Sequence, residues 1–304
     1  MKTIRLANMG DQVPAVIVGC MRMTELDERQ AEQFMAEALE MGANYFDHAD
    51  IYGGGICEEM FAKAIHMTPA VREKFFIQSK CGIVPGKKYD LSKDYILKHV
   101  DESLLRLQTD YLDMLLLHRP DALMEPEEVA DAFDALETSG KVRNFGVSNM
   151  KPIQIELLKK NVKQPLEVDQ IQLSIMNASM VTNGMNVNTS TELAIDRDGD
   201  VLDYCRLHDI TIQAWSPFQS VNGVFLNNEK YPELNRKLSE IADKYQVSNT
   251  AIAVAWLMRI PAKIQPIIGS MNIQRLRDCV RAAEIRLTRE EWYEIYLAAG
   301  YILP

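Results

Sequence analysis

Three titratable side chains end largely apolar segments of the chain. Asp47 follows YF, Lys80 follows FFIQS and His118 follows LDMLLL, while Tyr52 lies five residues after Asp47. A phenol has a pKa of about 10 and is a poor acid at neutral pH, but an ammonium beside it lowers that pKa, and a carboxylate can hold the ammonium in place. These residue types suit the transfer of a proton to a carbonyl oxygen, with Tyr52 as the acid and His118 orienting the carbonyl or sharing the proton. The hydride must come from a cofactor, because no side chain supplies one.

The elements that must position these residues alternate between a short apolar segment and a stretch with apolar residues at helical spacing. The predicted strands are Pro14–Gly19, Asn44–Asp47, Phe75–Lys80, Leu112–His118, Lys141–Val147, Val168–Leu173, Thr211–Trp215 and Ile264–Ile268. Eight such units in 304 residues predict an α/β fold of the (β/α)8 barrel (TIM barrel) type. A doubly wound sheet is the alternative, but it shows the same alternation with fewer strands. Barrel active sites lie at the carboxyl ends of the strands, where the four residues would meet.

Both ends of the chain carry further elements. Residues Thr3–Val13 are expected to form an N-terminal hairpin that turns at Met9-Gly10-Asp11, and Thr288 with Glu291 predicts a capped extra helix at the C-terminal end. Asp27 with Gln30 predicts the same kind of cap for the first barrel helix, and a further helix is expected to open near Asn149. We expect residues 1–304 to form a single domain of this type.

Composition excludes several classes of protein. There are 33 Lys and Arg against 43 Asp and Glu, so the net charge of −10 disfavours binding to nucleic acid. No run of about 18 apolar residues predicts a membrane span, and Met1–Arg5 lacks the apolar core of a secretory signal. Five scattered cysteines indicate free thiols in a reducing compartment, with Cys81 as an inert one. We therefore expect a soluble cytoplasmic protein, whose oligomeric state stays open.

Other chemistries lack their motifs. The sequence has no His-x-His or His-Glu-x-x-His to hold a metal, so no metal is expected. The segment GVSNM misses the last glycine of the nucleophile elbow of hydrolases. No Walker loop or Gly-x-Gly-x-x-Gly is present, so a dinucleotide would bind without a Rossmann motif.

Six segments together resemble the aldo-keto reductase superfamily, in that family's order along the chain. They are FDHADIYG at 46–53, SKCG at 79–82, LLHRPD at 116–121, GVSN at 146–149, WSP at 215–217 and PIIGS at 266–270. Within the superfamily, the stretches DHADIYGGG, VADAF and SGKVRNFGVSN are most similar to the YdhF-like oxidoreductases.

This resemblance implies a role for each matching residue. Tyr52 corresponds to the general acid, Lys80 and Asp47 to the pair that lowers its pKa, and His118 to the residue that orients the carbonyl. The cofactor would be NADP(H). Its nicotinamide carboxamide would be bound by Ser148, Asn149 and Gln170, and its nicotinamide ring would stack on Trp215. The loop 216–223, with Ser216 and Pro217, would lie over the pyrophosphate, and Gly269, Ser270 and Arg275 would lie at the adenosine 2′-phosphate end. A helix N-terminus and a guanidinium suit that phosphate, which favours NADPH over NADH, although Arg275 could instead belong to a solvated helix face.

The implied function is an NADPH-dependent oxidoreductase that reduces the carbonyl of a small aldehyde or ketone. Two other classes stay open: a regulatory subunit that binds the nucleotide without turnover, and a sugar-processing barrel without nicotinamide. The substrate itself does not follow from the sequence. Loops set specificity in barrels, so the polar segment 177–199 is expected to be its main determinant.

Overall fold

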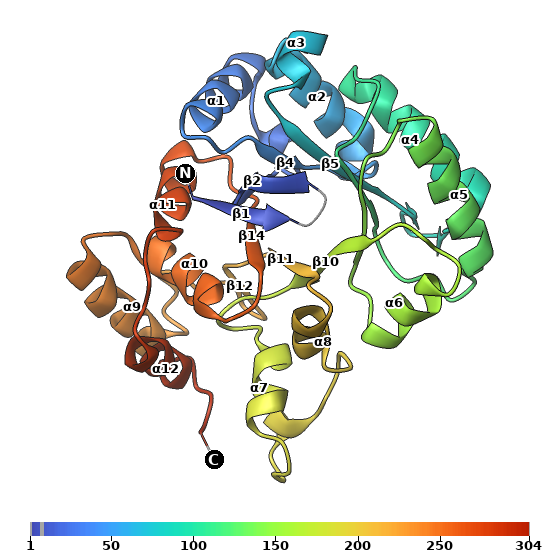
Figure 1. Cartoon of the computed structure of the whole chain (residues 1–304). Helices are drawn as coiled ribbons and strands as arrows, with labels where there is room; N and C mark the ends of the chain where they lie inside the picture. Colours follow the sequence, from blue (N-terminus) through green and yellow to red (C-terminus); the bar gives the residue numbers. More distant parts are fainter. Residues whose placement is uncertain (1, 7–8, 304) are drawn as a thin grey trace.

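Eight parallel strands close into a barrel in this protein (Figure 1). The computed structural model describes residues 2–6 and 9–303. Around the barrel the strands follow one another in chain order, and the last pairs with the first. They are β3 (Ile17–Gly19), β4 (Tyr45–Asp47), β5 (Phe76–Cys81), β8 (Met114–Leu117), β9 (Phe145–Ser148), β10 (Leu166–Gln172), β11 (Thr211–Trp215) and β14 (Ile264–Ile268). The predicted (β/α)8 fold is confirmed.

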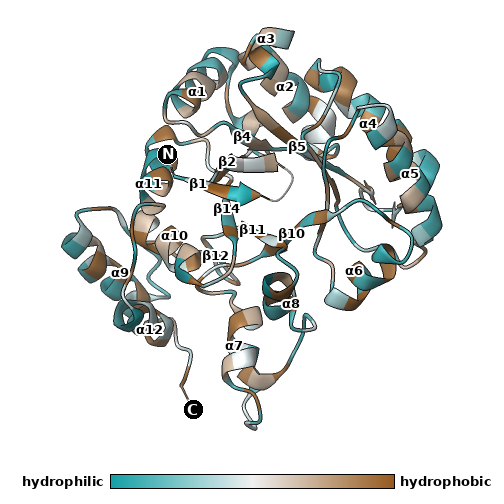
Figure 2. Ribbon diagram, viewed as in Figure 1, coloured by the Kyte–Doolittle hydropathy of each residue, from teal (hydrophilic) through white to brown (hydrophobic). Residues whose placement is uncertain are grey.

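Helices surround the barrel on the outside (Figure 1). The helices that follow the strands are α1 (Glu28–Glu40), α2 (Ile56–Ala64), α4 (Lys93–Leu107), α5 (Pro126–Thr138), α6 (Pro152–Lys159), α8 (Val201–Leu207), α9 (Pro232–Tyr245), α10 (Asn249–Arg259) and α11 (Ile273–Ala282). Shorter or additional elements are α3 (Pro69–Arg72), α7 (Ser179–Met185), α12 (Arg289–Ala298), the 3-10 turns η2 (Met23–Glu25), η3 (Tyr52–Gly55) and η4 (Glu192–Ala194), and the small pairs β6 (Ile83–Val84) with β7 (Lys88–Tyr89) and β12 (Gln219–Ser220) with β13 (Gly223–Val224). In Figure 2 the outer helices carry both hydrophilic and hydrophobic residues, as expected of helices with one buried face.

Two helices begin at the capping residues that were predicted from the sequence. Asp27 and Gln30 form a reciprocal capping box at α1, and Thr288 and Glu291 do the same at α12. The helix expected near Asn149 is α6, which begins at Pro152, because Asn149 has a φ of 58°, a left-handed conformation that a helix does not include. No described helix is long and apolar enough to cross a membrane.

An N-terminal hairpin covers the interior of the barrel at the end away from the strand C-termini. β1 (Thr3–Leu6) pairs antiparallel with β2 (Gly10–Pro14), and Leu6 and Val13 are buried in an apolar cluster with barrel residues such as Met114 and Val168. The hairpin is confirmed, but two residues of its predicted turn, 10 and 11, belong to the second strand, where Gly10 pairs with Leu6; Met9 lies between the two strands. Residues 7 and 8 lie outside the described part of the chain.

Tight packing inside the barrel predicts different outcomes for two glycine substitutions. A Cβ at Gly146 in β9 would lie 2.5 Å from Val168 Cγ2 and 2.8 Å from Leu116 Cδ2, whereas a Cβ at Gly184 in α7 would meet no atom within 4 Å. We expect Gly146→Ala to lower the free energy of unfolding by about 1–3 kcal/mol, because the strands must move apart. Gly184→Ala is the matched control and should leave stability unchanged or raise it by up to about 1 kcal/mol. Urea unfolding of both variants tests this; equal stabilities would contradict it.

Candidate active site

The four residues predicted to do chemistry meet at the carboxyl ends of β4, β5 and β8. Asp47 ends β4, Lys80 lies near the end of β5, His118 follows β8 directly, and Tyr52 begins η3. Asp47, Tyr52 and His118 line a cavity of about 930 Å3, and Lys80 lies behind them, only 1% exposed.

The loop after β4 is held along β5, and this brings Tyr52 to Lys80. The backbone amides of His48 and Asp50 donate to the carbonyl oxygens of Gln78 and Lys80, at 2.8 and 3.0 Å. The chain then turns, with the Tyr52 amide donating to the Ala49 carbonyl oxygen at 3.0 Å. Backbone hydrogen bonds therefore help to fix the position of the Tyr52 phenol next to Lys80.

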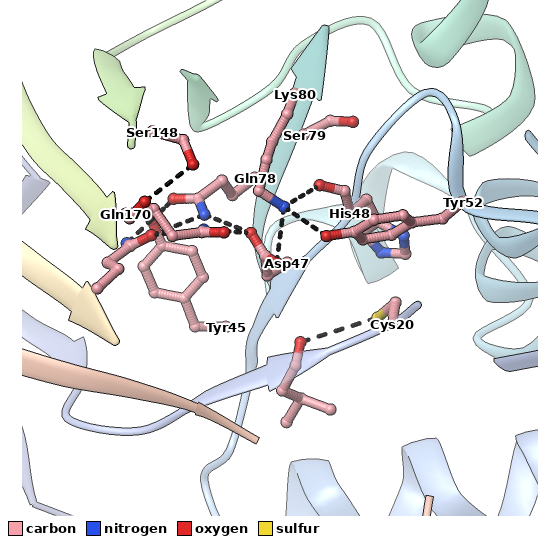
Figure 3. A network of polar contacts seen from close by, with 12 residues as sticks. Cys20, Tyr45, Asp47, His48, Tyr52, Gln78, Ser79, Lys80, Ser148 and Gln170 are labelled. Carbon is pink, nitrogen blue, oxygen red and sulfur yellow. Dashed lines mark hydrogen bonds and ion pairs between the residues drawn. The ribbon is translucent and has the colours of Figure 1, made fainter. Parts of the chain in front are cut away.

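The Lys80 ammonium uses all three of its hydrogens (Figure 3). Its Nζ lies 2.8 Å from Asp47 Oδ2, 2.7 Å from the His48 carbonyl oxygen and 3.1 Å from Tyr52 Oη. An ammonium has no acceptor, so the Tyr52 hydroxyl must be the acceptor in the last contact. Its own hydrogen has no acceptor within the described residues and is free to be donated to a group in the cavity.

Burial decides the protonation states of this pair. Burial alone would lower the pKa of Lys80, but Asp47 and the Tyr52 oxygen outweigh it and the pKa is raised, so the ammonium persists. Burial raises the pKa of Tyr52 above its usual value, although the Lys80 charge acts to lower it. Lys80 therefore acts on the pKa of Tyr52 in the expected direction, but the loss of hydration on burial has the larger effect. A phenol that keeps its proton is what an acid requires.

His118 is a neutral ring beside Tyr52. Burial, Lys80 and Arg119 together lower its pKa to about 2. The ring lies edge-on to Tyr52 with 6.1 Å between the ring centroids. A neutral imidazole offers one N–H and one acceptor nitrogen, so His118 can donate a hydrogen bond into the cavity without carrying charge.

The residues predicted to bind the carboxamide of a cofactor lie together on the cavity wall. Ser148, Asn149, Gln170 and Trp215 all line the cavity. Trp215 Nε1 donates to Asn149 Oδ1 at 3.1 Å, and Asn149 Nδ2 donates to Ser148 Oγ at 2.8 Å. Gln170 Nε2 donates to Asp47 Oδ1 at 2.9 Å, so this wall and the Lys80 site share the Asp47 carboxylate.

The other predicted cofactor residues line the same cavity. They are Ser216 and Pro217, directly after β11, and Gly269, Ser270 and Arg275, between the end of β14 and the first turn of α11. Arg275 donates to Ser270 Oγ at 3.2 Å and is otherwise exposed. The structure thus brings every predicted binding residue to one cavity.

Two arginines line this cavity that the sequence analysis did not predict as site residues. Arg22 lines it and donates to the Gly269 carbonyl oxygen at 2.8 Å. Arg119 also lines it, and no residue within 2–6 or 9–303 forms a hydrogen bond or an ion pair with its guanidinium. Its position directly after His118 at a strand end is the signal that could have identified it. Other lining residues that were not predicted include Met21, Glu25, Ile51, Asn227, Thr250 and Asn272.

The segment 177–199 does not line the cavity, so the expectation that it is the main determinant of specificity is wrong for this site. It folds into α7 and η4, and all of the lining residues come from other segments. Figure 1 places α7 outside the ring of helices, near the C-terminus. Its Asn residues bond locally: Asn186 Nδ2, for example, donates to the Thr182 carbonyl oxygen at 2.9 Å.

The cysteines are free and buried, as predicted. Burial and the nearby carboxylates of Asp50 and Glu58 raise the pKa of Cys81 well above its usual value, which makes it an inert thiol. Within the described residues, no group of three or more His, Cys, Asp or Glu could hold a metal ion. The cavity instead offers the side-chain amides of Asn149 and Gln170 and the guanidinium groups of Arg22, Arg119 and Arg275, which suits an anionic molecule that also carries an amide.

Comparison with known proteins agrees with this geometry. A model of the aldo/keto reductase family matches residues 15–298. The oxidoreductase YdhF of Escherichia coli (strain K12) is 35% identical, over 99% of this chain and 99% of that protein. A 6-dehydroglucose reductase of Agrobacterium fabrum is 35% identical, over 86% of this chain and 84% of that protein.

Among solved structures, a thermostable aldo-keto reductase in complex with the inhibitor epalrestat has the same fold. The TM-score is 0.76 at 28% identity, with 98% of this chain and 100% of that chain covered. The resemblance to aldo-keto reductases and to their YdhF-like branch is confirmed.

The ion pair between Lys80 and Asp47 predicts that a single and a double variant differ in their free energy of unfolding. Lys80→Met should lower the free energy of unfolding by about 3–5 kcal/mol, because it leaves the buried Asp47 carboxylate without its cation. The double variant Lys80→Met/Asp47→Asn removes that charge and keeps an oxygen for the neighbouring amides, so it should recover a large part of the loss. Chemical unfolding of the two variants measures the difference. Equal stability of the single and double variants would show that the carboxylate does not need the ammonium.

Proposed function

The chain belongs to the aldo/keto reductase family, and from this we propose that it is an NADPH-dependent oxidoreductase that reduces the carbonyl of an aldehyde or ketone to an alcohol, with Tyr52 as the general acid. The observation that carries the proposal is the Tyr52 hydroxyl. It accepts a hydrogen bond from Lys80 at 3.1 Å, keeps its proton through burial, and lines the cavity with its own hydrogen unused.

In this reaction the side chains act on the carbonyl oxygen. Tyr52 donates its proton to that oxygen, and the Lys80 ammonium stabilises the phenolate that forms. Asp47 keeps Lys80 in place and charged, since its Oδ2 lies 2.8 Å from Lys80 Nζ. His118, neutral at physiological pH, orients the oxygen by a hydrogen bond.

The cavity fits the proposed cofactor. Asn149 and Gln170 offer a free amide hydrogen and a free amide oxygen for the carboxamide, and Trp215 offers a ring for stacking. Arg275 and Ser270, beside the N-terminus of α11, are the proposed contacts of a 2′-phosphate, which favours NADPH over NADH. When bound, the dihydronicotinamide supplies the hydride that the side chains lack.

A polar substrate is favoured by Arg119. An unpaired guanidinium on a cavity wall has its hydrogen-bonding capacity available for hydroxyl, carboxylate or phosphate oxygens. Together with the name of the 6-dehydroglucose reductase relative, this favours a small hydroxylated aldehyde or ketone. The test panel should therefore contain sugar aldehydes and hydroxy ketones beside simple aldehydes.

Removal of the phenol hydroxyl tests the proposed acid. We expect Tyr52→Phe to lower kcat by about 10²–10⁴-fold, because no other group donates the proton, and to leave NADPH affinity within twofold. NADPH oxidation is followed at saturating substrate, and nucleotide affinity is measured by quenching of tryptophan fluorescence. Exposed Tyr89→Phe is the matched control and should keep full activity. If Tyr52→Phe keeps its turnover, Tyr52 is not the general acid. If the natural protein binds NADPH tightly but shows no turnover, a regulatory role is favoured.

The pKa directions predict the pH profile of reduction. Tyr52 must be protonated to act, and burial raises its pKa, so activity is present below the usual phenol value of about 10 and is lost only above it. His118, with a pKa of about 2, is neutral throughout and adds no step near pH 6–7. We expect kcat/KM at saturating NADPH to be level between about pH 6 and 9 and to fall above about pH 10. A fall centred near pH 6–7 would point to protonated histidine as the acid.

A further inference from the structure

Four glutamines form a buried layer inside the barrel below the cavity. Gln78 on β5, Gln213 on β11 and Gln265 on β14 are 0% exposed, and Gln170 on β10 is 3% exposed. Gln170 lines the cavity, whereas the other three do not. The layer therefore lies between the proposed cofactor site and the apolar interior.

Hydrogen bonds connect the layer to Asp47 (Figure 3). Gln78 Nε2 and Gln170 Nε2 donate to Asp47 Oδ1 at 2.5 and 2.9 Å. Both also donate to Gln213 Oε1, at 2.8 and 3.2 Å. Gln213 Nε2 in turn donates to Gln78 Oε1 and to Gln265 Oε1, each at 3.1 Å, and Gln265 Nε2 donates to the Pro14 carbonyl oxygen at 2.6 Å.

The two ends of the layer determine the direction of every amide. An ionised carboxylate and a backbone carbonyl oxygen only accept hydrogen bonds. Gln78 and Gln170 must therefore present their NH2 groups to Asp47, and Gln213 must present its oxygen to both of them. A reversed amide anywhere in the layer would place two donors or two acceptors against each other, which is costly in a buried site.

One acceptor remains unused on the cavity side. Both Gln170 amide hydrogens are committed, to Asp47 and to Gln213, while its Oε1 accepts no hydrogen bond from the described residues. Beside it, Asn149 Nδ2 uses one hydrogen on Ser148 and has one left. The wall thus presents one acceptor and one donor, which complement the NH2 group and the carbonyl oxygen of a carboxamide.

We infer that Gln213, which does not line the cavity, is a positioning residue that makes Gln170 present its oxygen to the carboxamide NH2 group. This rests on the proposed function, since it assumes that a nicotinamide binds at this wall. Gln213 Oε1 acts by taking the second Gln170 hydrogen. Without that acceptor, Gln170 keeps one bond to Asp47 and is free to rotate or to offer its remaining hydrogen to the cavity.

The test compares two oxidised nucleotides that differ at the carboxamide. NADP⁺ carries an NH2 group there, and its 3-acetylpyridine analogue carries a methyl group that cannot donate. We expect the natural protein to bind NADP⁺ about tenfold more tightly than the analogue, because the analogue leaves Gln170 Oε1 without a donor. In Gln213→Met this ratio should fall to about twofold or less. Calorimetric titration gives the ratio without any turnover.

Gln265→Met is the matched control. It makes the same substitution in the same buried layer and also leaves one Gln213 hydrogen without an acceptor, but it leaves Gln213 Oε1 in place for Gln170. It removes two side-chain hydrogen bonds where Gln213→Met removes four, so we expect a smaller loss of thermal stability, and the tenfold ratio should be kept. An equal loss of the ratio in both variants would mean that general loosening of the barrel, and not the orientation of Gln170, is responsible.

The outcomes separate this inference from the proposed function. If the natural protein binds neither nucleotide, the proposed function fails. If it binds NADP⁺ but does not discriminate, or if Gln213→Met keeps the tenfold ratio, the positioning role of Gln213 is overturned while the proposed function stands. Should Gln213→Met not fold, Gln213→Leu also lacks the acceptor for Gln170 and leaves Gln78 in place for Asp47 and the Tyr45 hydroxyl, so it should lose the ratio in the same way.

Discussion

The buried ammonium of Lys80 is the group on which the geometry of the cavity depends. A charge that is 1% exposed is stable only if acceptors surround it. Asp47, the His48 carbonyl and Tyr52 supply them, all from the end of β4 and the loop that follows. The same three contacts leave the Tyr52 hydrogen unused on the cavity side. The stability of this barrel mouth and the availability of a proton therefore depend on one set of hydrogen bonds.

The interior of the barrel is apolar at one end and polar at the other. At the end covered by the N-terminal hairpin it is apolar, with residues such as Ile17, Met114 and Val168, as is usual for such barrels. Below the cavity, glutamine amides take the place of branched apolar side chains. Buried amides are costly unless each donor and acceptor is matched. Here the matching is complete within Gln78 and Gln213, and the one unmatched oxygen lies on Gln170 at the cavity wall.

Local pattern predicted a large part of this molecule. The alternation of apolar segments and amphipathic stretches identified all eight barrel strands, two of them, Thr211–Trp215 and Ile264–Ile268, with their bounds. Polar residues at strand ends identified the site, because parallel strands in a barrel bring those ends together. The hairpin turn and the role of residues 177–199 were predicted wrongly. Both depend on register and on where a segment packs, which residue types alone do not specify.

The sequence by itself determined which chemistry is available: a phenol, an ammonium, a carboxylate and an imidazole at the ends of strands that must converge. Only the tertiary structure decided their protonation and direction. The raised pKa of Tyr52 comes from burial, and the orientation of Gln170 comes from Gln213 and Asp47, the latter 123 residues away in the chain. The Arg119 guanidinium has no hydrogen-bond or ion-pair partner among residues 2–6 and 9–303, which again depends on how the chain packs. Desolvation and hydrogen-bond partners are properties of the packed chain, so they cannot be read from the order of its residues.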